Sequence, residues 1–251
     1  MIAKAAGLPA DEVVVDLEDG VAPADKDEAR SRLGDAAARG TLAVRINAVG
    51  SAWWQDDLAA VAALRPDVIV LPKVESADHV RAVIELLPED VGLEVQIETA
   101  RGLLEVERLA AVGGPLEALV FGPGDFAASM GIPVLTIGAG SFDYALARIA
   151  VAARAHGLQA IDGPYADLRD PDGLRRSAAT ALAHGYDGKW VVHPDQVEPV
   201  NEAFSASPED VERAHRILAA SDGATLVDGD MVDVASKRLA ARVLARAATR
   251  G

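Results

Sequence analysis

LEVQIETARGLLEVERLAAVGGPLEALVFGPGD, residues 93–125, contains two apolar runs that each lead into an acidic side chain. Glu98 follows the run Leu93–Ile97, and Asp125 follows the run Ala118–Phe121 after Gly-Pro-Gly. The interval between the runs suits a strand plus a crossover helix, and nearly continuous apolar runs are typical of a parallel sheet covered on both faces. The stretch therefore predicts a βα unit with both carboxylates at one edge of a parallel sheet.

The same unit recurs, because short apolar runs alternate with segments of helical periodicity along the chain. The predicted strands are 13–17, 42–46, 68–71, 93–97, 118–121, 159–161 and 189–192, and the predicted helices include 23–39, 52–64, 76–87 and 170–184. A doubly wound sheet places its ligand at one switch point, whereas all strand ends of a barrel meet at one mouth. Since polar residues follow almost every run, we predict a TIM (β/α)8-type barrel.

Two parts of the chain fall outside this pattern. A helical fragment, residues 1–6, already leads into the run 13–17, so we expect the first strand of the barrel to be missing from this chain. After His193, two predicted helices, 208–220 and 235–248, flank the segment Leu226–Val234 and form a C-terminal helical extension. This extension should pack on the barrel as a cap, or lid, or reach a neighbouring subunit. The predicted domains are a catalytic barrel, 1–200, and a lid or extension, 201–251.

Composition excludes several classes of protein. Half of the 251 residues are hydrophobic and 25% are charged, which predicts a globular fold. The formal net charge of −15 argues against binding to nucleic acid or to an anionic membrane surface. There is no cysteine, which excludes thiol nucleophiles, disulfides and zinc ribbons. Because no apolar run approaches the ~20 residues that span a bilayer, we expect a cytoplasmic protein.

Glu98 and Asp125 are candidate ligands of Mg²⁺. They end consecutive strands, so a barrel would place them side by side, and Mg²⁺ commonly takes one or two carboxylates while keeping water and substrate in its other positions. The glycines before Asp125, Gly124 among them, expose N–H groups that can hold a carboxylate. The alternative is that each acid caps the following helix or pairs with Arg101.

Arg45 interrupts an otherwise apolar strand and is a candidate oxyanion clamp. A guanidinium in that position needs a partner, and Glu18 or Asp19 at the neighbouring strand end can neutralise it. The two roles are compatible, because a guanidinium held by a carboxylate is already oriented for a substrate oxygen. Asp16, Glu18 and Asp19 put three acids within four residues, and we expect some of them to surround the metal.

Lys4 and Lys26 flank the first predicted strand in a chain poor in lysine. They either face an anionic ligand or are simply solvated. His193 at a strand end is as often a hydrogen-bonded structural residue as a catalytic base.

Taken together, six motifs in order resemble the citrate lyase β-subunit-like family of the HpcH/HpaI-type Mg²⁺-dependent aldolases and lyases, which includes malyl-CoA and citramalyl-CoA lyases. The motifs are Asp16–Val21 with Lys26, Val44–Asn47, Leu71–Glu75, Ile97–Thr99, Gly122–Asp125 and Lys189–Pro194. The resemblance implies a homotrimeric TIM barrel in which Glu98 and Asp125 hold Mg²⁺ and Arg45 binds the substrate. It also implies that Asp233, in a lid segment 228–233, acts as acid/base, in its own or a neighbouring subunit.

The implied reaction is reversible cleavage of a 3-hydroxyacyl-CoA, of the citryl, malyl or citramalyl type, into an acyl-CoA and a keto acid. The resemblance assigns substrate binding to Arg45, Gly124, Asp125, Glu18, Asp19, Lys4, Val191 and Val192. Family members open with a strand that helps to bind the CoA phosphates, so its expected absence makes CoA binding less secure than metal binding. The alternatives are an aldolase acting on free keto acids, a non-catalytic subunit of a lyase complex, and a barrel hydrolase.

Overall fold

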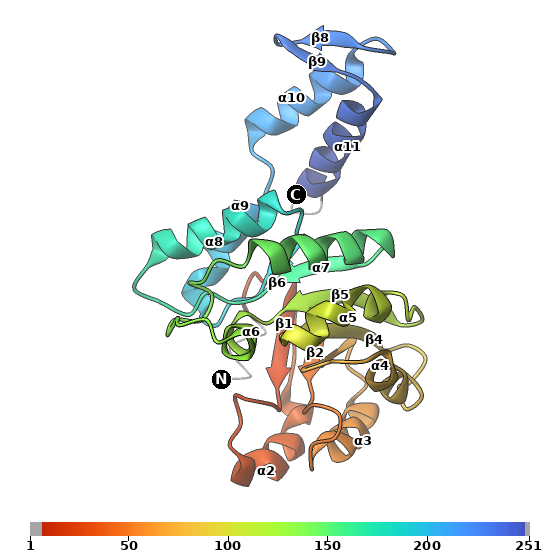
Figure 1. Cartoon of the computed structure of the whole chain (residues 1–251), viewed down its shortest axis with the longest axis vertical. Helices are drawn as coiled ribbons and strands as arrows, with labels where there is room; N and C mark the ends of the chain where they lie inside the picture. The colour runs from red at the N-terminus through yellow and green to blue at the C-terminus, as the bar shows by residue number, and fades with distance from the viewer. Residues whose placement is uncertain (1–6, 249–251) are drawn as a thin grey trace. The chain divides into compact units, whose positions relative to one another are not determined.

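The computed structural model describes residues 7–248, and the chain divides into two compact units, 1–200 and 201–251. The first unit contains a sheet of seven strands, all parallel and in chain order from β1 to β7 (Figure 1). The strands are β1 Glu12–Asp16, β2 Thr41–Arg45, β3 Val68–Leu71, β4 Gly92–Ile97, β5 Leu116–Phe121, β6 Gln159–Asp162 and β7 Gly188–Lys189. Chain order without a switch point is the arrangement of a barrel wall and excludes a doubly wound sheet.

The sheet is curled, as contacts across its concave face show: side chains from strands that are not neighbours meet there. Arg45 on β2 reaches Gln96 on β4, with Nη1 and Oε1 3.5 Å apart. Glu12 on β1 is hydrogen-bonded to Glu94, also on β4. Within residues 7–248, β1 and β7 each pair on one side only, so the sheet is an α/β half-barrel there, and its closure into a full barrel is not part of the described structure.

Helices connect the strands and lie along the outside of the sheet, where α5 packs on β4 and α7 packs on β5 and β6 (Figure 1). The helices of the first unit are η1 Pro23–Asp25, α2 Lys26–Ser31, η2 Leu33–Asp35, α3 Trp54–Leu64, α4 Ala77–Ile84, α5 Ala100–Ala110, α6 Pro123–Met130, α7 Asp143–Ala155, α8 Pro171–Ala183 and η3 Pro194–Gln196, followed by α9 Val197–Phe204 at the boundary. Among the described residues, no helix is long and apolar enough to cross a membrane.

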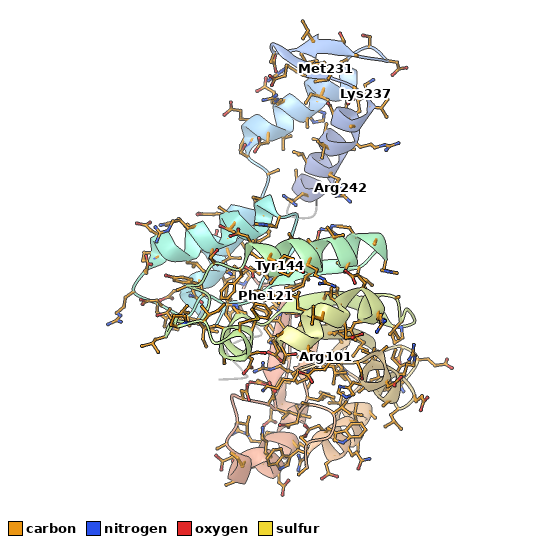
Figure 2. All side chains as sticks on the ribbon, in the orientation of Figure 1. Arg101, Phe121, Tyr144, Met231, Lys237 and Arg242 are labelled. Atoms are coloured by element: carbon orange, nitrogen blue, oxygen red, sulfur yellow. The ribbon has the colours of Figure 1, made fainter. Side chains whose placement is uncertain are left out.

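Apolar side chains pack on both faces of the sheet. All four residues of β3 are buried and branched, which suits a central strand. Between β5 and the helices, Phe121, Phe126 and Phe142 pack edge to face, with ring centroids 5.3–6.1 Å apart (Phe121 is labelled in Figure 2). Inside the curl, Val14 and Trp190 pack against a cluster of Ala43, Val68 and Val70.

Three predictions about local structure need correction or lie outside the description. The predicted strand 189–192 is wrong beyond Lys189, because β7 ends there. The predicted helix 23–39 is broken into η1, α2 and η2 and ends at Asp35. The helical fragment predicted for 1–6 lies outside the described residues.

Over residues 205–248, the second unit contains two helices and a hairpin. They are α10 Pro208–Ala219, the antiparallel strands β8 Thr225–Val227 and β9 Asp230–Val232, and α11 Val234–Ala248. Ser207 caps α10 by accepting from the N–H of Asp210, as its position before Pro208 indicates. Asp228 and Gly229 turn the hairpin with φ values of 54° and 89°, which is the Asp-Gly turn chemistry of a tight hairpin.

A buried ion pair ties β6 to β7 behind the curled sheet. The side chain of Lys189 is 1% exposed, and its ammonium donates to Asp162 Oδ2 at 2.5 Å, to the Gly163 carbonyl at 2.5 Å and to Ser177 Oγ at 2.9 Å. Removing one partner of such a pair leaves an uncompensated buried charge.

We therefore expect Lys189→Met to lower the free energy of unfolding by about 3–5 kcal/mol, measured by urea denaturation. The exposed pair of Arg65 and Asp90 supplies the control, since Arg65→Ala should leave stability unchanged. Adding Asp162→Asn to Lys189→Met should recover part of the loss. A double variant that is as unstable as the single one would contradict this account.

Acidic side chains lie close together where the strands of the sheet begin, at the amino-terminal end of the curl. Glu94 is 6% exposed, and Glu12 and Glu117 lie near it; among residues 7–248, its Oε2 has no hydrogen-bond partner. Burial, followed by the charges of Glu12 and Glu117, raises the pKa of Glu94. A carboxyl group whose pKa is raised in the folded state holds a proton that the unfolded chain releases, so stability falls as the pH rises above the ordinary pKa of 4.5.

Glu94→Gln cannot ionise, so we expect its unfolding free energy to fall less than that of the parent between about pH 5 and pH 9. Urea denaturation at a series of pH values measures the two curves, with Glu89→Gln at the surface as the control. Parallel curves for the parent and Glu94→Gln would show that Glu94 ionises as freely when folded as when unfolded.

Candidate functional site

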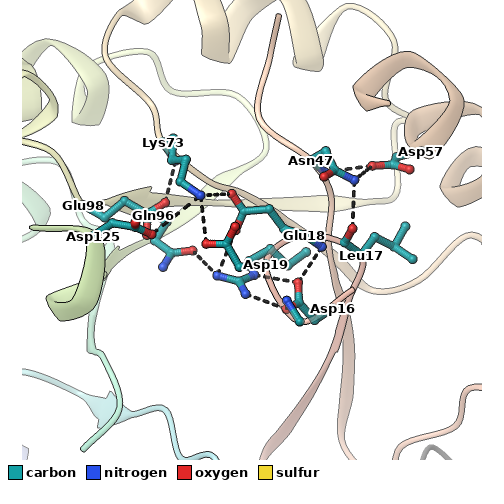
Figure 3. A network of polar contacts seen from close by, with 12 residues as sticks. Asp16, Leu17, Glu18, Asp19, Asn47, Asp57, Lys73, Gln96, Glu98 and Asp125 are labelled. Atoms are coloured by element: carbon teal, nitrogen blue, oxygen red, sulfur yellow. Dashed lines mark hydrogen bonds and ion pairs between the residues drawn. The ribbon is translucent and has the colours of Figure 1, made fainter. Parts of the chain in front are cut away.

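The carboxyl ends of β1 to β5 carry the predicted polar residues and meet at one mouth of the curl (Figure 3). Asp16 and Arg45 are register partners on β1 and β2, so their side chains leave the same face as neighbours. Arg45 donates to both oxygens of Asp16, from Nε at 2.8 Å and from Nη2 at 2.6 Å. This bidentate contact fixes the plane of the guanidinium, whose Nη1 lies 3.1 Å from Glu18 Oε2.

The turn after β1 is shaped around Asp16. Its two oxygens also accept from the N–H groups of Glu18 and Gly20, both at 2.8 Å. Although desolvation acts in the opposite direction, Arg45 and these two N–H donors hold the pKa of Asp16 below its usual range. Glu18 is 4% exposed and meets two cations, Arg45 and Lys73. The expectation that Glu18 neutralises Arg45 is met, whereas Asp19 pairs with Lys73 instead.

Lys26 is buried beneath this turn, which corrects the sequence-based expectation that it either faces an anionic ligand or is solvated. It is 5% exposed, and its ammonium donates to the carbonyls of Leu17 and Glu18 and to Asn47 Oδ1 at 2.7, 2.7 and 2.8 Å. Asn47 is held in turn by Asp57, which accepts from its side-chain amide and its backbone N–H. The buried network fixes the backbone that carries Glu18.

Glu98 directly follows β4, and Asp125 lies in the first turn of α6, which follows β5. Neither takes the alternative role of capping a helix or pairing with Arg101 among the described residues. Thr99 caps α5 by accepting from the N–H of Gly102, and Arg101 pairs with Glu105 at 3.5 Å. Glu98 is 1% exposed and accepts from the backbone N–H of Lys73 at 2.7 Å. Asp125 is partly exposed and lies 3.7 Å from the ammonium of Lys73.

Burial raises the pKa of Glu98 to about 8, with further contributions from the negative charges of Glu18 and Asp125. Gly122 permits this close approach, because a Cβ there would come within 2.4 Å of Glu98 Cβ. Gly124 lies in the first turn of α6, next to Asp125. The mouth thus concentrates carboxylates in a partly desolvated space, an arrangement that a bound cation relieves.

Glu98 and Asp125 offer oxygen donors, which suit Mg²⁺ better than a transition metal that prefers histidine or cysteine. The sequence motifs at the ends of β1 to β5 contain neither of these residues. Among residues 7–248, no cluster of three or more His, Cys, Asp or Glu is arranged to hold a metal. A site of two carboxylates completed by water and substrate is the usual form for Mg²⁺.

The structure does not bring all predicted site residues together. Lys4 lies outside the described residues. Val191 and Val192 follow the end of β7, with Val192 exposed and its N–H donating to Gln196 at 3.0 Å. His193 takes the structural alternative, because its ring accepts from the Asp195 N–H and caps η3.

Asp233 belongs to the second unit, at the start of α11. One of its carboxylate oxygens accepts from the N–H groups of Ala235 and Ser236 at 2.8 and 3.1 Å. These bonds, together with the Ser236 hydroxyl, hold the pKa of Asp233 below its usual range. At neutral pH the free carboxyl group is therefore ionised.

Sequence reasoning placed Lys73 at a strand end but gave it no role. Its backbone is in the left-handed region, with φ 52°, which directs its N–H towards Glu98 while its side chain reaches Glu18, Asp19 and Asp125. The available signals were its position after β3 and Pro72 and its place in the motif Leu71–Glu75. Gln96, which faces Arg45, was hidden within an otherwise apolar run.

Comparison with known proteins assigns the chain to a family of aldolases and lyases. Residues 1–194 match the HpcH/HpaI aldolase/citrate lyase family, and the chain belongs to that family. It is 36% identical to L-malyl-CoA/β-methylmalyl-CoA lyase of Cereibacter sphaeroides over 97% of this chain and 89% of that protein. It is also 38% identical to a (3S)-malyl-CoA thioesterase of the same species, over the same shares of the two chains.

Among solved structures, the chain is similar to CitE from Mycobacterium tuberculosis in complex with magnesium, acetoacetate and coenzyme A. The TM-score is 0.81 and the identity is 36%, covering 95% of this chain and 90% of that one. The resemblance deduced from the six motifs is thereby confirmed.

Proposed function

We propose that this protein is a Mg²⁺-dependent carbon–carbon lyase that reversibly cleaves a 3-hydroxyacyl-CoA into an acyl-CoA and a keto acid. The observation that carries the proposal is the mouth, where a guanidinium fixed by Asp16 stands among the carboxylates of Glu18, Glu98 and Asp125. The similarity to a malyl-CoA lyase along 97% of the chain supports the reaction type. We further propose that the curled sheet is the larger part of a (β/α)8 barrel.

Glu98 and Asp125 would hold the metal, and Glu18 and Asp19 would surround it. The metal, when bound, supplies positive charge for the substrate oxygen that becomes a carbonyl on cleavage. Arg45 binds the same oxygen or the adjacent carboxylate, and it needs no reorientation because Asp16 has already fixed its plane. Gly124, Val191 and Val192 contribute contacts to the substrate, and Lys4 contributes to the nucleotide end.

Asp233 is the proposed acid/base. In the cleavage direction the substrate hydroxyl passes its proton to solvent water, the carbon–carbon bond breaks, and its electron pair passes to the thioester as an enolate. Asp233 takes up a proton from the solvent and transfers it to the enolate carbon. In the reverse direction Asp233 removes that proton, and its ionised state at neutral pH suits this step. We propose that residues 201–251 form the lid that delivers it, within a cytoplasmic homotrimer, and light scattering tests the assembly.

We expect Glu98→Gln and Asp125→Asn each to lose Mg²⁺ binding, measured by calorimetry, and Mg²⁺-dependent cleavage of acyl-CoA substrates. Both variants should keep their fold by circular dichroism, since each exchanges an oxygen for a nitrogen. Asp172→Asn, on the exposed first turn of α8, is the matched control and should bind Mg²⁺ like the parent. Parent-like Mg²⁺ affinity in both mouth variants would remove the metal from this position.

The reaction itself is tested by incubating a panel of malyl-, citramalyl-, methylmalyl- and citryl-CoA with the protein and Mg²⁺. A lyase releases a keto acid together with acetyl- or propionyl-CoA. The similarity to a malyl-CoA thioesterase favours one second candidate, a hydrolase, which releases free CoA and the intact hydroxy acid. An aldolase on free keto acids needs no CoA, and a non-catalytic subunit turns over nothing alone.

Asp233→Asn should leave Mg²⁺ affinity and substrate binding unchanged but slow the exchange of acetyl-CoA methyl protons with deuterated solvent, on the order of 10²–10⁴-fold. Proton NMR of acetyl-CoA in D₂O measures the exchange. If the lid serves a neighbouring subunit, mixing inactive Asp233→Asn with inactive Glu98→Gln protein should restore part of the activity. Exchange at the parent rate in Asp233→Asn would exclude the acid/base role.

A further inference from the structure

Lys73 makes more contacts with the mouth carboxylates than its place in the sequence suggests. Its ammonium lies 2.6 Å from Glu18 Oε1, 2.9 Å from Asp19 Oδ2 and 3.7 Å from Asp125 Oδ2 (Figure 3). Its backbone N–H donates to Glu98 Oε1 at 2.7 Å. One residue thus touches both proposed metal ligands, Glu98 through the main chain and Asp125 through the side chain.

The carboxylates around the mouth pair with two cations, Arg45 and Lys73. Arg45 is committed to Asp16 and Glu18. Within the described ranges of the chain, the ion pairs of Asp19 and Asp125 are both with Lys73. The ammonium is on a flexible stem and is 32% exposed, so it can move by more than the rigidly held guanidinium.

We propose that Lys73 competes with the metal for Asp125: its ammonium pairs with Asp19 and Asp125 before the metal enters and then yields Asp125 to it. This inference rests on the metal site of the proposed function. The contact with Asp125 is the longest of the three, so the ammonium keeps its partners Glu18 and Asp19 when Asp125 turns to the metal. Its backbone N–H meanwhile continues to aim Glu98.

Two cations that share one carboxylate repel each other. The direction in which Mg²⁺ affinity changes on removal of the lysine charge therefore distinguishes a competing lysine from a purely structural one. If Lys73 only scaffolded the mouth, removing its charge would disorder the ligands and weaken Mg²⁺ binding. If it competes with the metal for Asp125, removing its charge strengthens Mg²⁺ binding. In the metal-free protein the same change removes the ion pairs that Asp19 and Asp125 make with Lys73, so thermal stability falls.

The experiment compares the full chain with Lys73→Met and Lys73→Arg, each freed of metal with EDTA and then titrated with MgCl₂ by calorimetry. We expect the dissociation constant for Mg²⁺ to fall about three- to tenfold in Lys73→Met and to stay at the parent value in Lys73→Arg, which keeps the charge. Lys73→Gln is a second neutral variant, with the same expected change. Lys237→Met, which loses a lysine paired with Asp222 in the second unit, is the control and should behave as the parent.

Thermal unfolding gives a readout that does not depend on activity. Lys73→Met should melt below the parent in EDTA, and MgCl₂ should raise its melting temperature by more than it raises that of the parent. Equal or weaker Mg²⁺ binding in both neutral variants, beside normal binding by the parent, would overturn the role of Lys73 alone. A parent protein that binds no Mg²⁺ would overturn the proposed function and this role with it.

Discussion

The bidentate contact between Arg45 and Asp16 is the interaction on which the mouth depends. The parallel register of β1 and β2 makes these residues neighbours, and the contact turns a costly charge in an apolar strand into a fixed guanidinium plane. Asp16 simultaneously accepts from the N–H groups of Glu18 and Gly20. The position of Glu18, and through it the position of Lys73, therefore follows from the same carboxylate.

Parallel strands impose a second constraint, because they bring every carboxyl end to one edge of the sheet. Acids at several ends then repel one another, and the pKa of Glu98 is raised by its burial and, to a smaller extent, by this repulsion. The fold accommodates the repulsion with Arg45, with Lys73 and, in our proposal, with a divalent metal. At the amino-terminal end of the curl the repulsion is relieved by protonation instead of by a cation. Glu94 has a raised pKa there and a hydrogen bond to Glu12.

Much of this arrangement could be predicted from the sequence. Alternating apolar runs gave strands close to the observed ones, and the polar residues that follow them identified the mouth, because strand polarity and parallel pairing are local properties. Contacts between distant strands could not be predicted in this way. Lys26 resembles a surface lysine in sequence but is buried, and the left-handed backbone of Lys73 has no signal in a non-glycine residue. The Asp228-Gly229 sequence is typical of a hairpin turn, but the prediction treated Leu226–Val234 as a single segment.

The central claim is that Glu98 and Asp125 hold one divalent cation at the mouth of the curled sheet. Crystals grown with Mn²⁺, a carboxylate-binding substitute for Mg²⁺, test it directly by anomalous diffraction. The account predicts one strong anomalous peak within coordination distance of both carboxylates, with the Lys73 ammonium turned towards Glu18 and Asp19. A mouth without a peak at saturating Mn²⁺, or a peak bound only by other residues, would contradict it.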